Sequence, residues 1–243
     1  MAAVPGAHRR KPRPPAVEQN GSAAGRLDVR VPPGATTLDG FRAWALSDDF
    51  PENLRATFIG GELFLDMSNE EYQTHILVKG EICRVLMNLC REQQAGQFYA
   101  DGGLLTNERA SVSNNPDSSF VSWESLESGR VQFVPRKGVG GQLIEMVGTP
   151  DWVLEVVSES SVEKDTRRLR QAYHRAGIPE YWLVDARGDE IVFQILRRRK
   201  KGYAAAPVKD GWQRSAVFGR SFRLVRERQR LGMWQYTLEV KSP

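Results

Sequence analysis

The chain has 243 residues, 40% of them hydrophobic, which is enough to bury a sizeable core in one large domain or two small ones. Its apolar runs are too short to cross a bilayer, which argues against a membrane-spanning protein. Residues 1–36 hold six basic and two acidic residues and account for the whole net charge of +4, so the remainder is neutral rather than broadly basic.

Residues 1–36 are rich in Ala, Pro, Gly and Arg and lack apolar periodicity. This composition predicts a disordered basic arm, followed by one domain over residues 37–243. The beginning of the chain has no central apolar run of the kind that marks a secretory signal, so we expect a cytosolic location. Cys83 and Cys90 are seven residues apart on a predicted helix, too far for a disulfide, and we expect two buried free thiols.

The first predicted element is a short helix over Thr37–Ala45, with Thr37 as its N-cap. A hairpin follows, because Gly60-Gly61 separates the apolar runs Ala56–Ile59 and Glu62–Met67.

A long helix comes next and ends near Gly96. Ser68 and Glu71 have the spacing of a capping box and predict its start. One apolar stripe runs along it, made of Val78, Ile82, Val85, Leu86, Leu89 and Cys90. The stretch Gln97–Val121 then predicts two strands around a polar turn.

The clearest strand is Trp152–Val157, in which alternate side chains point to opposite faces. Ser160 with Glu163 predicts a second capping box, and Gly177 predicts the C-terminal stop of that helix. Tyr181–Val184 is a further strand.

Ile191–Leu196 predicts a hairpin partner for that strand, and residues 203–243 predict more strands with a terminal helix or edge strand. The order of elements indicates a mixed α/β fold, with a mixed sheet flanked by helices.

Glu155 is the most informative residue, because it is a charge in the middle of an apolar strand. Such a charge is costly unless it is paired or binds a metal. It therefore forms an ion pair with an arginine of a neighbouring helix, or it is a metal-binding or acid/base carboxylate.

A divalent cation would need a second carboxylate. Asp151 is four residues from Glu155 on the same strand, roughly 13 Å away, which is too far to share one ion easily. Asp117, after Pro116, can approach from an adjacent strand and is preferred, although a turn residue after proline is the ordinary interpretation of it.

These residues carry a family resemblance. The segments Thr149–Ser160, Lys164-Asp165 and Ala176–Asp185, together with Pro116-Asp117 and His75, resemble the Uma-type restriction endonuclease family of the PD-(D/E)XK superfamily. The resemblance spans about Thr37 to Val225. It implies a restriction endonuclease-like core that hydrolyses DNA phosphodiester bonds, with Mg²⁺ (or Mn²⁺) held by Asp117 and Glu155.

The lysine of the family pattern is displaced in this chain. The third position of E-x-K is Val157, and the helix position four residues after Asp165, where the family usually has its lysine, is Leu169. Lys164 is the candidate that could reach the site from the side of the helix, and its alternative is a solvated surface lysine. His75 is either a histidine at the edge of the core or an active-site residue.

The leading hypothesis is a metal-dependent endonuclease acting on DNA, with Asp117, Glu155, Lys164 and His75 as site residues. One alternative is a catalytically degenerate nuclease fold that serves as a nucleic-acid-binding or regulatory module. Another is a protein–protein interaction subunit. A homodimer follows by analogy with nucleases that cut two strands. The basic run Arg197–Lys201 is either a solvated turn or a phosphate contact.

Overall fold

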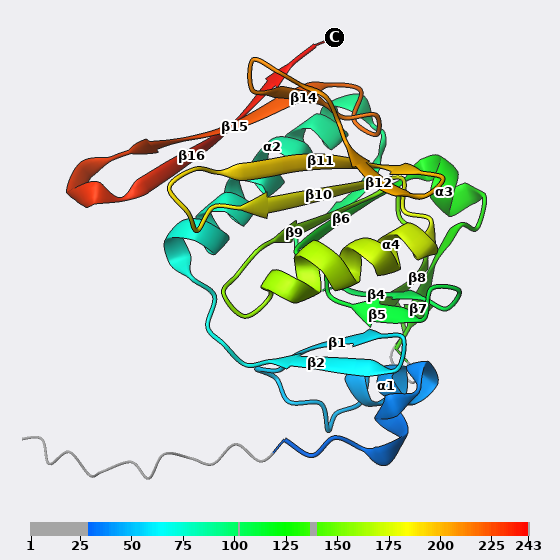
Figure 1. Cartoon of the computed structure of the whole chain (residues 1–243). Coiled ribbons are helices and arrows are strands. Elements are labelled where there is room, and N and C mark those ends of the chain that lie inside the picture. The colour runs from blue at the N-terminus through cyan, green and yellow to red at the C-terminus, as the bar shows by residue number, and fades with distance from the viewer. Residues whose placement is uncertain (1–28, 102, 137–139, 243) are drawn as a thin grey trace, which may run out of the picture. The chain divides into compact units, whose positions relative to one another are not determined.

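The computed structural model of the chain describes residues 29–101, 103–136 and 140–242 (Figure 1). Most of the predicted N-terminal arm, residues 1–28, lies outside the described residues. Pro33–Thr36, at the end of that arm, form a 3-10 turn. Helix α1 (Leu38–Ala45) follows and begins as predicted, because Thr37 Oγ1 accepts a hydrogen bond from the Gly40 N–H.

The first sheet has the strand order β2-β1-β5-β4-β8-β7. The predicted hairpin is confirmed, since β1 and β2 pair antiparallel on either side of Gly60 and Gly61, both of which have positive φ. The strands of this sheet are β1 (Arg55–Ile59), β2 (Glu62–Asp66), β4 (Leu104–Asn107), β5 (Val112–Asn114), β7 (Val131–Pro135) and β8 (Leu143–Gly148).

The central sheet has the order β12-β11-β10-β9-β6-β3. Its two middle strands, β9 and β10, run parallel, and a helical segment crosses between them. Strand β11 pairs antiparallel with β10, which confirms the predicted hairpin. The strands are β3 (Gly96–Tyr99), β6 (Ser118–Ser122), β9 (Trp152–Val156), β10 (Glu180–Asp185), β11 (Val192–Arg199) and β12 (Gly202–Ala205).

Helices cover both faces of the central sheet (Figure 1). On one face, α2 (Leu77–Gln93) packs its apolar stripe against Trp152, Leu154 and Val156. On the other face, α4 (Arg170–Ala176) contacts Val153 and Val157, which are also close to the first sheet. The predicted alternation along β9 is therefore confirmed, and Glu155 points to the α4 face. The short helix α3 (Trp123–Glu127) follows β6.

The C-terminal sheet has the order β13-β14-β15-β16 and packs against α2 through β16. The last strand lies at the sheet edge, so the expected edge strand is present where a terminal helix was the alternative. The strands are β13 (Val208–Lys209), β14 (Trp212–Arg214), β15 (Ser221–Arg228) and β16 (Trp234–Lys241), with a 3-10 turn at Arg230–Gly232.

Both predicted capping boxes are wrong. The first helix begins later, in a π-helical turn over Tyr72–Ile76, and Glu71 itself caps it by accepting from Thr74. The Ser68 hydroxyl donates to Asp66 instead of capping. Ser160 likewise donates to Asp66, at 2.8 Å, rather than capping the second helix.

The stretch Gln97–Val121 contains more strands than the two predicted, because β5 occupies the expected polar turn and β4 precedes it. Cys83 and Cys90 are buried free thiols, as expected. No helix among the described residues is both long and apolar enough to cross a membrane.

Candidate active site

A cavity of about 360 Å³ lies beside the β1–β2 hairpin and the end of β9. All four residues selected from the sequence line it: His75, Asp117, Glu155 and Lys164. Two of the elements that form its wall are π-helical turns, Tyr72–Ile76 with His75 and Lys164–Leu169 with Lys164. Isolated π-helical turns occur frequently at functional sites in proteins.

Asp117, the residue before β6, and Glu155 of β9 both line the cavity. Strands β6 and β9 are antiparallel, with Ser118 opposite Leu154, so the next position of this register sets Asp117 opposite Glu155. The Val156 N–H donates to Asp117 Oδ2 at 2.6 Å, which fixes the carboxylate against β9. The sheet register therefore brings together two carboxylates that are far apart in the sequence.

Glu155 is 2% exposed and has neutral hydrogen-bond partners. Its Oε1 accepts from the Tyr173 hydroxyl at 2.5 Å and from Asn114 Nδ2 at 3.3 Å. No arginine among the described residues pairs with Glu155, so the structure does not bear out the alternative of an arginine ion pair. Burial raises the pKa of Glu155 well above its usual range, and the carboxylates of Asp165 and Asp117 raise it further, against Lys164 and the Tyr173 hydrogen bond.

Lys164 faces the cavity rather than solvent alone. Its Nζ lies 3.1 Å from Asp165 Oδ1, and Asp165 is itself buried. Burial acts to lower the pKa of Lys164, but the carboxylates of Asp165 and Glu155 outweigh it and raise the pKa, so the ammonium stays charged. Leu169, at the family's usual lysine position, is packed in the core between the sheets.

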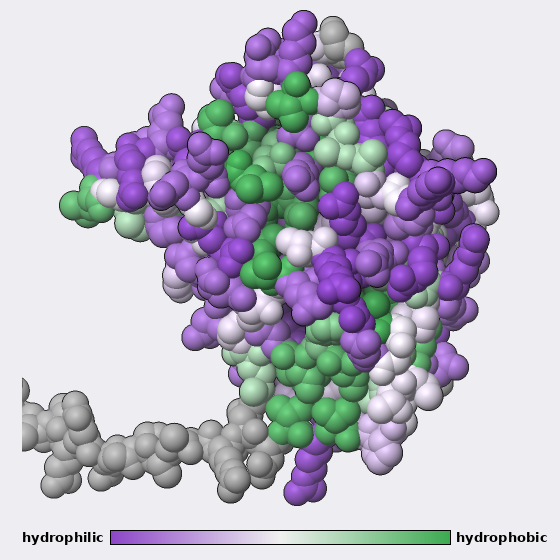
Figure 2. Space-filling view, in the orientation of Figure 1, coloured by the Kyte–Doolittle hydropathy of each residue, from purple (hydrophilic) through white to green (hydrophobic). Residues whose placement is uncertain are grey.

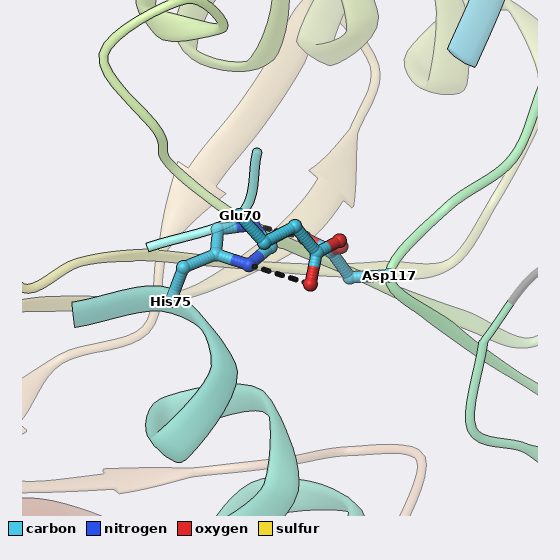
Figure 3. A group of neighbouring side chains, drawn as sticks. All are labelled: Glu70, His75 and Asp117. Atoms are coloured by element: carbon cyan, nitrogen blue, oxygen red, sulfur yellow. Dashed lines mark ion pairs between the residues drawn. The ribbon is translucent and has the colours of Figure 1, made fainter. Parts of the chain in front are cut away.

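On the other side of Asp117, three possible metal ligands converge (Figure 3). His75 Nδ1 lies 3.6 Å from Glu70 Oε2, and His75 Nε2 lies 3.6 Å from Asp117 Oδ2. Burial tends to lower the pKa of His75, yet the hydrogen bond and charge of Asp117 raise it overall. The nearest ligand atoms of these three residues lie within 4.8 Å of one another, a spacing that one cation could bridge.

Lys79 and Glu70 belong to this cluster, and sequence reasoning missed them. Lys79 is buried, and its Nζ lies 3.1 Å from both Glu70 oxygens, 3.1 Å from Asp101 and 3.8 Å from Asp117. Arg55 Nη1 also contacts Glu70, at 2.6 Å. One signal was present in the sequence: Lys79 follows His75 by four residues, so both share a helix face with the apolar stripe.

Asp151, the rejected alternative, has a structural role. Its Oδ2 accepts from the Ser122 N–H at 2.7 Å and from the Ser125 hydroxyl at 2.8 Å, at the beginning of α3. Arg130 pairs with the same carboxylate. Asp151 does not line the cavity, so the preference for Asp117 as the neighbour of Glu155 agrees with the geometry.

A family model described as "Putative restriction endonuclease", Uma2, matches residues 38–225. The match covers most of the chain and contains every residue of the cavity named above. The chain belongs to the Uma2 family. The resemblance predicted from the motifs is thereby confirmed, and membership of Uma2 points to a nuclease.

A solved structure has the same fold as this Uma2 chain. It is the crystal structure of "a putative nuclease belonging to DUF820" from Anabaena variabilis ATCC 29413, with a TM-score of 0.54 and 17% identity. The likeness covers 75% of this chain and 90% of the other. It confirms the predicted restriction endonuclease-like fold. Among curated proteins, none matches the chain.

Proposed function

We propose that the protein is a metal-dependent endonuclease that hydrolyses DNA phosphodiester bonds, with Asp117 and Glu155 as ligands for Mg²⁺ or Mn²⁺. The observation that supports this most is the position of Glu155, a buried strand carboxylate directly opposite Asp117 in a cavity. The donor set fits a hard divalent cation, which prefers carboxylate oxygens. A cation there would also offset the like charges that raise the pKa of Glu155.

The charges around the cavity favour this pair over the Glu70 side. Glu70 already has two cationic partners, Arg55 and Lys79. Within the part of the chain that the structure describes, Lys164 is the one cation beside Glu155 and Asp165, and the hydrogen-bond partners of Glu155 are neutral. On the Glu155 side of Asp117, two acidic side chains therefore share one cation, and a bound divalent ion would add the positive charge that favours their ionised forms.

When bound, the metal ion would supply Lewis acidity to the scissile phosphate and lower the pKa of an attacking water. The remaining work falls to side chains of this chain. The ammonium of Lys164 stabilises negative charge that develops on the phosphate, in place of the absent E-x-K lysine. His75 holds Asp117 ionised, because its hydrogen bond and charge lower the pKa of that carboxyl against the opposing effect of burial.

The test is cleavage of plasmid and single-stranded DNA by the purified protein with Mg²⁺ or Mn²⁺. Wild type should nick or cut at least one substrate, and Glu155→Ala should not. Cleavage that persists in Glu155→Ala would refute the proposal. Tests with RNA beside DNA would identify the preferred nucleic acid.

One observation favours a second candidate, a degenerate nuclease fold that only binds nucleic acid. The E-x-K position is Val157, which is fully buried in the core and can offer no charge to the cavity. This candidate predicts salt-dependent DNA binding without metal uptake at Asp117 and Glu155.

A further inference from the structure

The far end of the β15–β16 hairpin extends away from the rest of the C-terminal sheet (Figure 1). Residues 226–234 form this end, which we call the arm. All residues from Glu227 to Met233 are exposed. The arm begins directly after residue 225, where the Uma2 match ends, so it is a feature of this chain beyond the family match.

The arm is basic and carries an apolar tip, on a domain over residues 37–243 whose net charge, with the arm included, is zero. It has three arginines, Arg226, Arg228 and Arg230, against one acidic residue, Glu227. Leu231 at the turn is 99% exposed. Figure 2 shows the same arrangement, with a hydrophilic hairpin end at the left and a hydrophobic spot at its tip.

Stacking holds the arginines of the arm in place. The guanidinium carbons of Arg226 and Arg228 lie 4.3 Å and 3.7 Å from the Trp234 ring centroid. Arg226 also donates to backbone oxygens of Ala186 and Gly188, so it anchors the base of the arm. Arg228 is exposed as a residue, although its Nη1 donates to the Gly232 carbonyl at 2.6 Å. Arg230 is also exposed, and its side chain has no partner among the described residues.

The base of the arm is attached to the segment that carries His75. The Trp234 N–H donates to Gln73 Oε1 at 2.8 Å, and Gln73 lies in the same π-helical turn as His75. The Leu238 N–H donates to Glu81 Oε1 at 3.0 Å on α2. These contacts place the arm beside the wall of the candidate active site, so one polymeric substrate could touch both.

We infer that the arm is a DNA-binding element, with Arg228 and Arg230 on phosphates and Leu231 as an apolar contact in a groove. A two-stranded ribbon fits the major groove of DNA, and exposed apolar residues beside arginines serve as wedges in DNA-binding proteins. Positive charge on a neutral domain favours DNA over a protein partner. The inference rests on the proposed nuclease function for its choice of substrate.

The test measures binding of a fluorescein-labelled 30-base-pair duplex by the full chain in EDTA, over a range of salt concentrations. The variant Arg228→Gln/Arg230→Gln removes two phosphate contacts. The slope of log K for DNA association against the logarithm of the salt concentration should become shallower by about 1.8. At 0.1 M salt this change corresponds to a roughly 60-fold loss of affinity. Arg228→Lys/Arg230→Lys should keep the wild-type salt slope. Leu231→Ser should lower the affinity for DNA and leave the salt slope unchanged. Thermal melts of each variant check that the fold is intact.

Lys200→Gln/Lys201→Gln is the matched control, since it removes two exposed charges from the turn between β11 and β12. An unchanged slope in the arm variant, or the loss appearing in the control instead, would overturn the inference. Loss of a dimer on light scattering with unchanged DNA affinity would assign the arm to a protein interface and also overturn it. Binding in EDTA does not require cleavage. An error in the inference about the arm would therefore show in the binding assay, whereas an error in the proposed nuclease function would show in the cleavage assay.

Discussion

Replacing Glu155 with glutamine should remove the stabilisation of the protein by Mn²⁺. The amide is nearly isosteric and its oxygen can still accept from the Tyr173 hydroxyl, so the fold should persist. For wild type, Mn²⁺ at one hundred times its dissociation constant should add about 2.7 kcal/mol to the free energy of unfolding. In a domain of this size that corresponds to a rise in Tm of roughly 5–11 °C.

Differential scanning calorimetry in EDTA and in Mn²⁺ measures this rise. Glu180→Gln is the matched control, because Glu180 is also a buried strand glutamate but accepts from Ser215 and Ala216, away from the cavity. The control should keep the full Mn²⁺ shift, and Glu155→Gln should lose it. A full shift in Glu155→Gln, or its loss in the control, would refute the reasoning.

Three further predictions concern the stability of the protein. The raised pKa of Glu155 and of His75 means that the folded state holds protons above the usual values of 4.5 and 6.5. Stability should therefore fall as pH rises above 4.5 for the Glu155 contribution and above 6.5 for the His75 contribution. Urea titrations should show a smaller fall for Glu155→Gln, and an equal fall would contradict this. Lys79→Met removes a buried ammonium from the partly buried carboxylates of Glu70 and Asp117 and should cost about 3 kcal/mol. Mn²⁺ should restore part of the lost stability. A urea titration in which the free energy of unfolding falls by less than about 1 kcal/mol would contradict the prediction. Tyr173→Phe removes the donor to Glu155 and should cost about 1–3 kcal/mol, a value that the same titration checks. No measurable cost would mean that the hydrogen bond contributes nothing.

Local patterns were sufficient for much of the fold. Alternation along Trp152–Val157 predicted which side chains share a face of the sheet, because the period of a strand is two residues. Gly177 predicted the helix end, and it has φ of 86° there. The capping boxes failed because hydroxyl groups can bond to any nearby carboxylate. Asp66, at the end of β2, accepts from the hydroxyls of both Ser68 and Ser160.

The site was only partly predictable, because its geometry depends on strand register. Glu155 was identified from its own neighbours in the sequence, whereas the position of Asp117 opposite it follows from the pairing of β6 with β9. Lys79 and Glu70 belong to no recognisable sequence motif. A lysine in an apolar helix stripe is ordinarily interpreted as a surface residue whose aliphatic part is buried. Their place in the cluster depends on the folded structure, which brings Glu70 and Asp117 close to Lys79.

The most direct test of the central claim is a crystal structure of the protein soaked in Mn²⁺, with anomalous data that locate the ion. We expect a peak between the carboxylates of Asp117 and Glu155, and no peak in crystals of Glu155→Gln. A wild-type crystal with no ion at these two residues, or with an ion only at Glu70 and His75, would contradict the claim.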